Sequence, residues 1–430
     1  MRVLMFGWEF PPHIAGGLGT ACKGIVEGLA HNGVETLFVM PSASGDEDQS
    51  CTTIVNASDI PLVEVSSSVE EFMDKVKFIK VDSSLQPYFN PEDFDRIAEE
   101  TRKRQTREYR MQFGRKFRFS GKYGANLLEE VARYAGVGAT IAYDNKYAFD
   151  VIHAHDWLTY PAGIAAKEVS GKPLVVHVHA TSFDRGSDDM IDSRVYAIER
   201  RGMEAADCVV TVSDLTRNIV INKYGIDPSK VVTVHNAVDF SGRENLDVER
   251  GVKDKVVTFL GRITYQKGPE YFIEAAAKVL KRTRNVRFVM AGSGDMMTRA
   301  IRQVARLGIS DRFHFTGFLR GQDVQKMFAL SDVYIMPSVS EPFGISPLEA
   351  MRSNVPSIIS HQSGAAEVLK YALKVDFWDV DAMADDIYAL IQYPALASFA
   401  TRQGYDEVNG LKWNEAAAKL KNVYESVVNK

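Results

Sequence analysis

Short runs of β-branched and apolar residues alternate along this sequence with longer segments whose apolar residues recur at helical spacing. In the first half the runs are VLMF, ETLFVM, FDVIHAH, PLVVHVHA and DCVVTVS. Such alternation is typical of a parallel sheet whose two faces are both covered by helices. It therefore predicts an α/β fold of the doubly wound type.

The pattern begins again after a polar stretch, DFSGRENLDVERGVKDK, and continues through KVVTFLGR, VRFVMAGSG, RFHFTGF, DVYIMPS and VPSIIS. Two Rossmann-like domains of similar size are therefore predicted, over residues 1–240 and 256–410. The amphipathic segment 411–430 is predicted to be a helix that either covers the second domain or crosses back to the first. Because ligands of such sheets bind beyond the carboxyl ends of the strands, we expect the domains to face a cleft that holds the site.

Composition excludes several classes of protein. The chain has 430 residues, 45% of them hydrophobic and 25% charged, as in soluble globular proteins. Its net charge of −5 argues against nucleic acid as the main partner. No run is long enough for a membrane span or arranged like a signal peptide, so we expect a cytoplasmic protein. The three cysteines lack a disulfide framework or CxxC spacing, and reduced thiols are expected at Cys22, Cys51 and Cys208.

Two adjacent glycines, Gly16 and Gly17, lie between the first predicted strand, 3–6, and a predicted helix over 20–30. Glycine lets a ligand approach bare backbone, and the first N–H groups of a helix have no partner within the helix. This arrangement suits a phosphate group. An ordinary strand-to-helix turn is the alternative.

The stretch FLGRITYQKG opens the second domain and brings two cations to the end of a predicted strand, Arg262 and, five residues later, Lys267. Arginine with its planar fork and lysine as a point charge can together clamp a diphosphate. They would also neutralise the charge that builds on a departing pyrophosphate. Surface cations without a ligand are the alternative.

The stretch SEPFGISPLEAM carries two acidic residues, Glu341 and Glu349, with seven residues between them. Gly344 keeps Glu341 on a loop, and Pro347 suits the first turn of a helix that carries Glu349. One carboxylate can hold a ribose diol and the other sugar hydroxyls, with Gly344 and Ile345 as further candidates for nucleotide-sugar contact. Helix capping and the helix dipole also explain acids here without a ligand.

Two histidine-rich stretches end predicted strands of the first half, HAHDW over 153–157 and HVHATSF over 177–183. His179 is the best placed of these residues for a ligand-binding cleft. A zinc site would need further ligands beside His177 and His179. Asp156 could serve, but the spacing matches no familiar metal motif, so no metal site is predicted.

The stretch 102–122 combines many Lys and Arg residues with aromatic ones. A solvated helix face is the first interpretation. The alternative is a surface for an anionic or carbohydrate acceptor, or peripheral contact with the headgroup layer of a membrane.

Taken together, these motifs resemble the retaining GT-B glycosyltransferases of families 4 and 5, the group that includes glycogen and starch synthases. The resemblance covers nearly the whole chain: the double-glycine loop, HAHDW, the second histidine strand, GRITYQKG and EPFGISPLE. It implies an acceptor-side first domain and a second domain that binds the nucleotide-sugar donor.

The resemblance also implies roles for single residues. Gly17 would offer backbone N–H groups to the donor phosphate, Arg262 and Lys267 would bind the diphosphate, and Glu349 would hold the ribose. His179 would contact the transferred sugar, and Glu341 would lie against its hydroxyls. The family uses no metal, so the DED sequence at 46–48 is interpreted as a solvated loop rather than a metal-binding DxD motif.

The implied reaction is transfer of a glucosyl unit from UDP-glucose or ADP-glucose to a glucan, as in glycogen synthases, with no cofactor beyond the nucleotide-sugar co-substrate. Ile14 stands where similar ADP-glucose enzymes have lysine, and Glu349 is the family 4 form of the second acidic motif. Both departures keep UDP-glucose at least as plausible a donor. With no nucleophile paired with a second carboxylate at the strand ends, front-face attack is expected.

Four alternatives remain at this point. A family 4 transferase could act on a lipid-linked or surface polysaccharide acceptor, and an epimerase could use the same fold. A nicotinamide-dependent oxidoreductase would need the AGSGDM loop, where Gly292 and Gly294 are followed by Met297 in place of a third glycine. A non-catalytic module that binds sugar nucleotides is the fourth.

Overall fold

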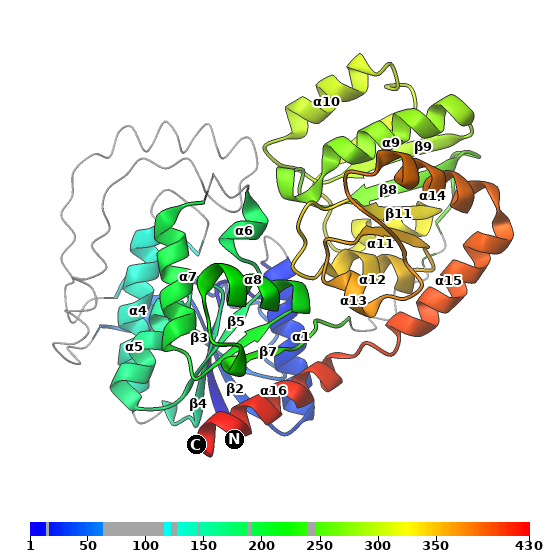
Figure 1. The fold of residues 1–430 in the computed structure, drawn as a ribbon. Helices are drawn as coiled ribbons and strands as arrows, with labels where there is room; N and C mark the ends of the chain where they lie inside the picture. Colours follow the sequence, from blue (N-terminus) through cyan, green and yellow to red (C-terminus); the bar gives the residue numbers. More distant parts are fainter. Residues whose placement is uncertain are drawn as a thin grey trace, which may run out of the picture. The chain divides into compact units, whose positions relative to one another are not determined.

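The computed structural model describes residues 1–13, 17–62, 116–121, 127–144, 147–186, 191–238, 246 and 248–430. The chain forms two compact units, one of residues 1–183, 187–235 and 413–430 and the other of residues 184–186 and 236–412 (Figure 1). Each unit is built on a parallel sheet, with helices between successive strands. The predicted α/β class with two Rossmann-like domains is thus confirmed. The predicted boundary at 240–255 stays a prediction, because part of it lies outside the described residues.

The sheet of the first unit has the strand order β3-β2-β1-β4-β5-β6-β7, and every neighbouring pair is parallel. Its central strands are buried along almost their whole length because helices cover both faces. The strands are β1 (Arg2–Phe6), β2 (Glu35–Met40), β3 (Thr53–Asn56), β4 (Val151–His155), β5 (Leu174–Val178), β6 (Cys208–Thr211) and β7 (Val231–Thr233). The helices are α1 (Gly17–His31), η1 (Ala57–Asp59), α4 (Leu127–Tyr143), α5 (Tyr160–Ser170), α6 (Ser182–Arg185), α7 (Ser193–Ala205), α8 (Asp214–Tyr224), η4 (Pro228–Lys230) and α16 (Trp413–Val428).

The sheet of the second unit has the order β10-β9-β8-β11-β12-β13, again parallel throughout. Its strands are β8 (Lys255–Leu260), β9 (Val286–Ala291), β10 (Phe313–Gly317), β11 (Val333–Met336), β12 (Ser357–Ser360) and β13 (Leu373–Val375). Its helices are η5 (Tyr265–Lys267), α9 (Pro269–Arg282), α10 (Met297–Arg306), α11 (Gln322–Leu330), α12 (Ile345–Arg352), α13 (Ala365–Val368), α14 (Val380–Gln392) and α15 (Pro394–Val408).

Every strand predicted from the sequence is present, but β3, β7 and β13 were not predicted. All three lie at the edge of a sheet and are only three or four residues long. An edge strand is paired on one side only and less completely covered, so it needs no continuous apolar run. Only β13, LKV, lacks such a run, whereas β3 and β7 carry the β-branched runs TIV and VVT, which were missed from the sequence because both strands are short and partly exposed.

Helix α16 belongs to the first unit although the chain reaches it from the second. Its buried residues recur at intervals of three and four, which places them on one face of the helix. That face packs against α1, where two glycines make room for Trp413. A Cβ atom at Gly24 would lie 2.2 Å from Trp413 Cε2, and one at Gly28 would lie 2.5 Å from the Trp413 carbonyl oxygen. The absence of side chains at Gly24 and Gly28 thus determines how closely α16 packs against α1.

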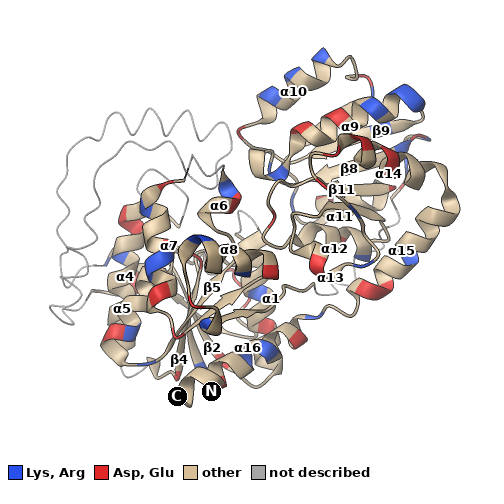
Figure 2. Ribbon diagram, viewed as in Figure 1, with Lys and Arg blue, Asp and Glu red and all other residues tan. Residues whose placement is uncertain are grey.

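Charged residues of both signs are interspersed over the helices of each unit in the view of Figure 2, whereas the strands carry few. Of the predicted basic stretch 102–122, residues 102–115 and 122 lie outside the described residues. Within the described part of the chain, no helix has the length and apolar composition that crossing a membrane requires.

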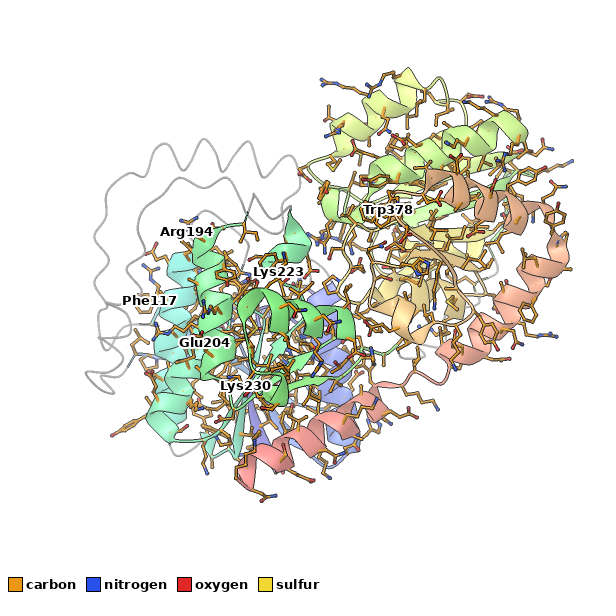
Figure 3. All side chains as sticks on the ribbon, viewed as in Figure 1. Phe117, Arg194, Glu204, Lys223, Lys230 and Trp378 are labelled. Atoms are coloured by element: carbon orange, nitrogen blue, oxygen red, sulfur yellow. The ribbon has the colours of Figure 1, made fainter. Side chains whose placement is uncertain are left out.

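We expect Trp413→Ala to lower the free energy of unfolding of the first unit by about 3–5 kcal/mol, because it empties a buried space that α1 cannot fill. Trp378→Ala is the matched control, since Trp378 (labelled in Figure 3) is 58% exposed and Trp413 is 3% exposed. Urea unfolding followed by circular dichroism measures both variants. Equal effects of the two substitutions would contradict the packing described for α16.

Candidate functional site

The predicted site residues lie at or just beyond the carboxyl ends of strands in both units, where parallel sheets bind ligands. In the second unit Arg262 follows β8, and Glu341 follows the neighbouring strand β11. In the first unit His179 follows β5 directly, and Gly17 is the first residue of α1. Each unit therefore presents its own group of polar side chains.

Lys267 and Glu341 form an ion pair that joins the loops after β8 and β11. Ser338 Oγ donates a hydrogen bond of 3.2 Å to the same carboxylate oxygen, Oε2, of Glu341. The lysine and glutamate side chains are only 19% and 8% exposed, so water screens the pair little. Lys267 is thereby held at the strand ends by an acidic partner.

The turn that carries Lys267 is pressed closely against the loop after β11. Gly268, which follows it, has a φ of 64°. A Cβ atom there would lie 2.1 Å from the Pro337 carbonyl oxygen, so this position requires glycine for its conformation and for space. The backbone N–H of Val339 also donates to the carbonyl oxygen of Gln266, at 2.9 Å. These contacts fix the lysine relative to Glu341.

Arg262 donates from Nη2 to Oε1 of Gln266, at 2.8 Å. Gln266 is buried, so it can orient the guanidinium without competing water. The sequence prediction included neither Gln266 nor Ser338. Both are neutral residues, Gln266 within GRITYQKG and Ser338 just before SEPFGISPLEAM, and no spacing or charge distinguished them.

Backbone hydrogen bonds hold the loop of Glu341 in place. Its N–H donates to the Gln362 carbonyl oxygen, and its carbonyl oxygen accepts from Gly364 N–H, both at 2.9 Å. Gly344, the N-cap residue before α12, has a φ of 94°, a conformation that a residue with a side chain rarely adopts. Ile345 is the first residue of the helix, and Pro347 lies in its first turn, as predicted.

Glu349 lies on α12, partly buried, and its carboxylate accepts no hydrogen bond from the described residues. Burial raises the pKa of this carboxyl, and the nearby Arg352 opposes that shift. A partly buried carboxylate without hydrogen-bond donors is costly to the folded chain. A ligand with paired hydroxyl groups would supply the missing donors.

Gly17 is exposed at the start of α1, and no described atom lies within 4 Å of the position that its Cβ would take. Packing in the described structure therefore does not require glycine at this position. Gly16 lies outside the described residues, as does Ile14.

His179 is held from two directions. Its Nε2 lies 2.9 Å from His155 Nδ1, and its backbone N–H donates to Asp156 Oδ1 at 2.7 Å. Asp156 also accepts from Ala180 N–H at 3.3 Å and has a left-handed φ of 59°. The carboxylate considered as a metal ligand thus caps the backbone after β5.

Four imidazoles lie together at the ends of β4 and β5, and burial lowers the pKa of each. The pKa values of His153 and His179 fall to about 3, and those of His155 and His177 lie well below the ordinary histidine value. Neighbouring imidazoles lower the pKa values of His153, His155 and His177 further, because two adjacent positive charges repel. All four rings are therefore neutral at physiological pH.

The DED segment at 46–48 forms a loop of the first unit. Asp46 and Asp48 are exposed, in agreement with the predicted solvated loop. Glu47 differs, because its side chain is buried and accepts from Ser44 N–H at 2.7 Å and Gly45 N–H at 2.9 Å. It stabilises the turn and does not face solvent with its neighbours.

The glycines of AGSGDM have a packing role. A Cβ atom at Gly292 would lie 1.8 Å from the Gly261 carbonyl oxygen, and one at Gly294 would lie 2.2 Å from that of Ile263. Ile263 N–H also donates to Ser293 at 2.9 Å. The two loops pack backbone against backbone, which explains both glycines without a dinucleotide.

Comparison with known proteins gives two family matches. Residues 243–406 match the model of the glycosyl transferases group 1, and residues 90–241 match that of glycosyltransferase family 4. An uncharacterised glycosyltransferase of Methanocaldococcus jannaschii is 28% identical over 99% of this chain and 98% of its own length. A protein of Mycobacterium tuberculosis named glycogen synthase is 22% identical over 99% of this chain and 94% of its own length.

Solved structures share the same fold. Sucrose-phosphate synthase from Thermosynechococcus elongatus gives a TM-score of 0.71 at 16% identity, covering 99% of this chain and 98% of that one. Anabaena HepE, solved in complex with UDP and glucose, gives a TM-score of 0.65 at 16% identity. The match covers 99% of this chain and 100% of that one.

The two parallel-sheet units and these matches define a glycosyltransferase of the GT-B fold class. Residues 243–406 belong to the group 1 glycosyltransferases, and residues 90–241 match a family 4 glycosyltransferase domain. The resemblance stated from the sequence motifs is thus confirmed.

We expect Glu349→Gln to stabilise the second unit by about 0.5–2 kcal/mol at neutral to mildly alkaline pH, because it removes a carboxylate that burial disfavours when ionised. The pKa of Glu349 is raised by folding, so its ionisation costs stability as the pH rises above the ordinary range for glutamate. The advantage of the variant should therefore disappear as the pH falls to about 4, where the wild-type carboxyl is protonated.

Thermal unfolding across this pH range measures the effect, and the exposed Glu249→Gln is the control. A stability difference between Glu349→Gln and wild type that does not change with pH would contradict this account.

Proposed function

We propose that this chain is a retaining glycosyltransferase that moves a glucosyl unit from UDP-glucose or ADP-glucose to a glucan, as a glycogen synthase does. The observation that carries the proposal is the pair of cations after β8, with Lys267 held on Glu341 and Arg262 on Gln266. The alignment of a Mycobacterium tuberculosis glycogen synthase along 99% of the chain supports the acceptor class. The UDP and glucose bound by the similar Anabaena protein support the donor class.

On the donor side, the diphosphate would bind Arg262 and Lys267. Lys267 has three N–H donors, so it can contact a phosphate oxygen while it still donates to Glu341. The Glu341 carboxylate can in turn accept hydrogen bonds from sugar hydroxyls. Glu349 would accept from the two ribose hydroxyls, which supply the donors that its carboxylate lacks.

In the first unit, His179 would contact the transferred sugar. Its Nε2 is directed at His155, so Nδ1 is the ring nitrogen left for a hydroxyl group. Because this imidazole is neutral, it adds no positive charge next to an oxocarbenium-like centre. Gly17 would approach the donor phosphate with its backbone N–H.

Retention would follow from front-face attack. The leaving diphosphate accepts the proton of the acceptor hydroxyl as the new glycosidic bond forms and the sugar–phosphate bond breaks. Arg262 and Lys267 stabilise the negative charge that develops on the leaving group, a role that metal ions fill in other transferases. The mechanism therefore needs no metal and no cofactor at this position.

The test is release of nucleoside diphosphate from UDP-, ADP- and GDP-glucose, UDP-GlcNAc and GDP-mannose, each with and without glycogen or malto-oligosaccharide. The proposal requires release that depends on both a glucose donor and a glucan. Donor binding without glucan-dependent release would contradict the glucan acceptor and direct the search to lipid-linked and surface polysaccharides.

We expect Arg262→Ala to lower kcat by about 100- to 1,000-fold, because it removes one of two preorganised charges at the leaving group. Arg302→Ala is the matched control, since Arg302 is exposed on α10 of the same unit. Steady-state kinetics with the preferred donor measures both variants. Unchanged turnover in Arg262→Ala would contradict the assigned role.

A further inference from the structure

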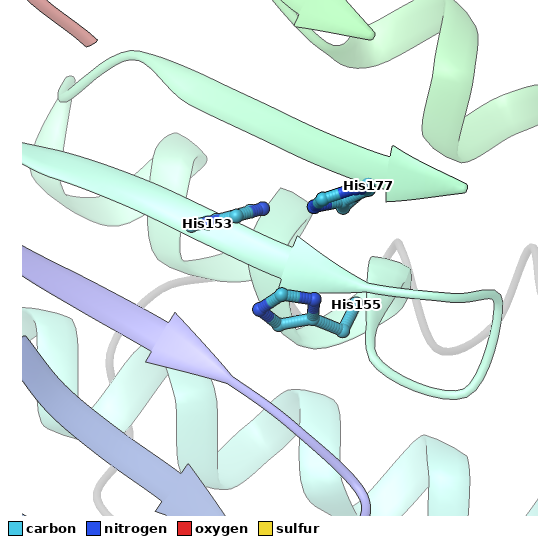
Figure 4. Close-up of side chains that lie close together, drawn as sticks. All are labelled: His153, His155 and His177. Carbon is cyan, nitrogen blue, oxygen red and sulfur yellow. The ribbon is translucent and has the colours of Figure 1, made fainter. Parts of the chain in front are cut away.

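Three histidines form a compact group behind His179, and none of them has a role in the proposed transfer. His153 and His155 lie on β4, and His177 lies opposite His155 on the neighbouring strand β5. All three side chains are on the same side of the sheet and at most 1% exposed. Figure 4 shows the three imidazoles close together on β4 and β5.

The distances between the rings are short. The ring centroids of His153 and His155 lie 4.3 Å apart, and each lies 5.4 Å from that of His177. One ring nitrogen from each residue can be chosen such that all three lie within 4.8 Å of one another. Three ring nitrogens therefore lie close enough together to be ligands of one metal ion.

Several of these nitrogens are buried without a hydrogen-bond partner. They are Nε2 of His153, Nε2 of His155 and both ring nitrogens of His177. Buried polar atoms in folded proteins are nearly always paired, because an unpaired one costs free energy. Four unpaired ring nitrogens in one place indicate a missing ligand, and a metal ion, which accepts the lone pairs of nitrogen, is such a ligand.

The outer hydrogen bonds of the group determine which nitrogens face inward. His153 Nδ1 lies 2.6 Å from Tyr424 Oη, and His155 Nδ1 lies 2.9 Å from His179 Nε2. If both Nδ1 atoms carry the proton and donate outward, the lone pairs of both Nε2 atoms remain free for a ligand. Metal-binding histidines are commonly oriented in this way by a partner on the other nitrogen.

We propose that His153, His155 and His177 bind a divalent transition-metal ion, and that zinc is the ion best suited to them. Neutral imidazoles suit zinc and its neighbours, whereas Mg²⁺ and Ca²⁺ require oxygen ligands. Three histidines leave the fourth position of a tetrahedral zinc ion to a non-protein ligand.

The ion of this site would take no part in the bond changes of the proposed transfer. Its ion would link β4 to β5 and, through His155, fix the ring of His179, while the charges at the leaving group stay those of Arg262 and Lys267. Zinc binding can therefore be measured without donor or acceptor, so its failure is distinguishable from failure of the proposed function.

The test uses the purified full chain, freed of metal with a chelator, then supplied with zinc sulfate and desalted. Elemental analysis should find about one zinc per chain. The thermal midpoint should rise by a few degrees, because an ion that binds only the folded chain stabilises it. Cobalt in place of zinc should give the visible absorption of tetrahedral coordination. A chain that retains no stoichiometric zinc and shows no thermal shift would overturn the proposal.

Two variants and a control locate the ion. His177→Phe should abolish stoichiometric binding. Tyr424→Phe keeps all three ligands but removes the partner of His153, so zinc affinity should fall by about 10- to 100-fold. The exposed His31→Gln should bind like wild type. If His177→Phe does not fold, Tyr424→Phe decides, and unchanged zinc affinity in that variant would overturn the assignment to this cluster.

Discussion

The ion pair between Lys267 and Glu341 determines how the second unit presents its charges. It joins the loops that leave two adjacent strands, β8 and β11, at a position nearly closed to water. Burying two charges is costly, and the cost is offset only where geometry and further hydrogen bonds are good. Ser338 supplies one such bond, and the αL conformation of Gly268 brings the two loops together. A cation is thereby fixed at the strand ends before any ligand arrives.

The first unit uses a buried carboxylate in a similar way. Asp156 binds the backbone N–H groups of His179 and Ala180 and so fixes the direction in which the chain leaves β5. In both units an acid in one loop positions a functional residue of another, His179 in the first and Lys267 in the second. Asp156 acts through the backbone and need not touch substrate, whereas Glu341 both holds Lys267 and is expected to accept hydrogen bonds from the sugar.

The features that could be predicted from the sequence were the buried strands and the charged residues at their ends. The buried central strands were recognised from β-branched runs, and Arg262, Lys267 and Glu341 stood out as charges at their ends. The supporting residues Gln266 and Ser338 are neutral, so no pattern distinguished them. The group of His153, His155 and His177 was hidden for another reason: the HxH repeats are visible in the sequence, but only the pairing of β4 with β5 sets His177 opposite His155.

The most direct measurement is a crystal structure of the chain with UDP or ADP. The account predicts a diphosphate in contact with the Arg262 guanidinium and Lys267 Nζ, with the ribose hydroxyls on the Glu349 carboxylate. A bound nucleotide that contacts none of these three side chains would contradict it.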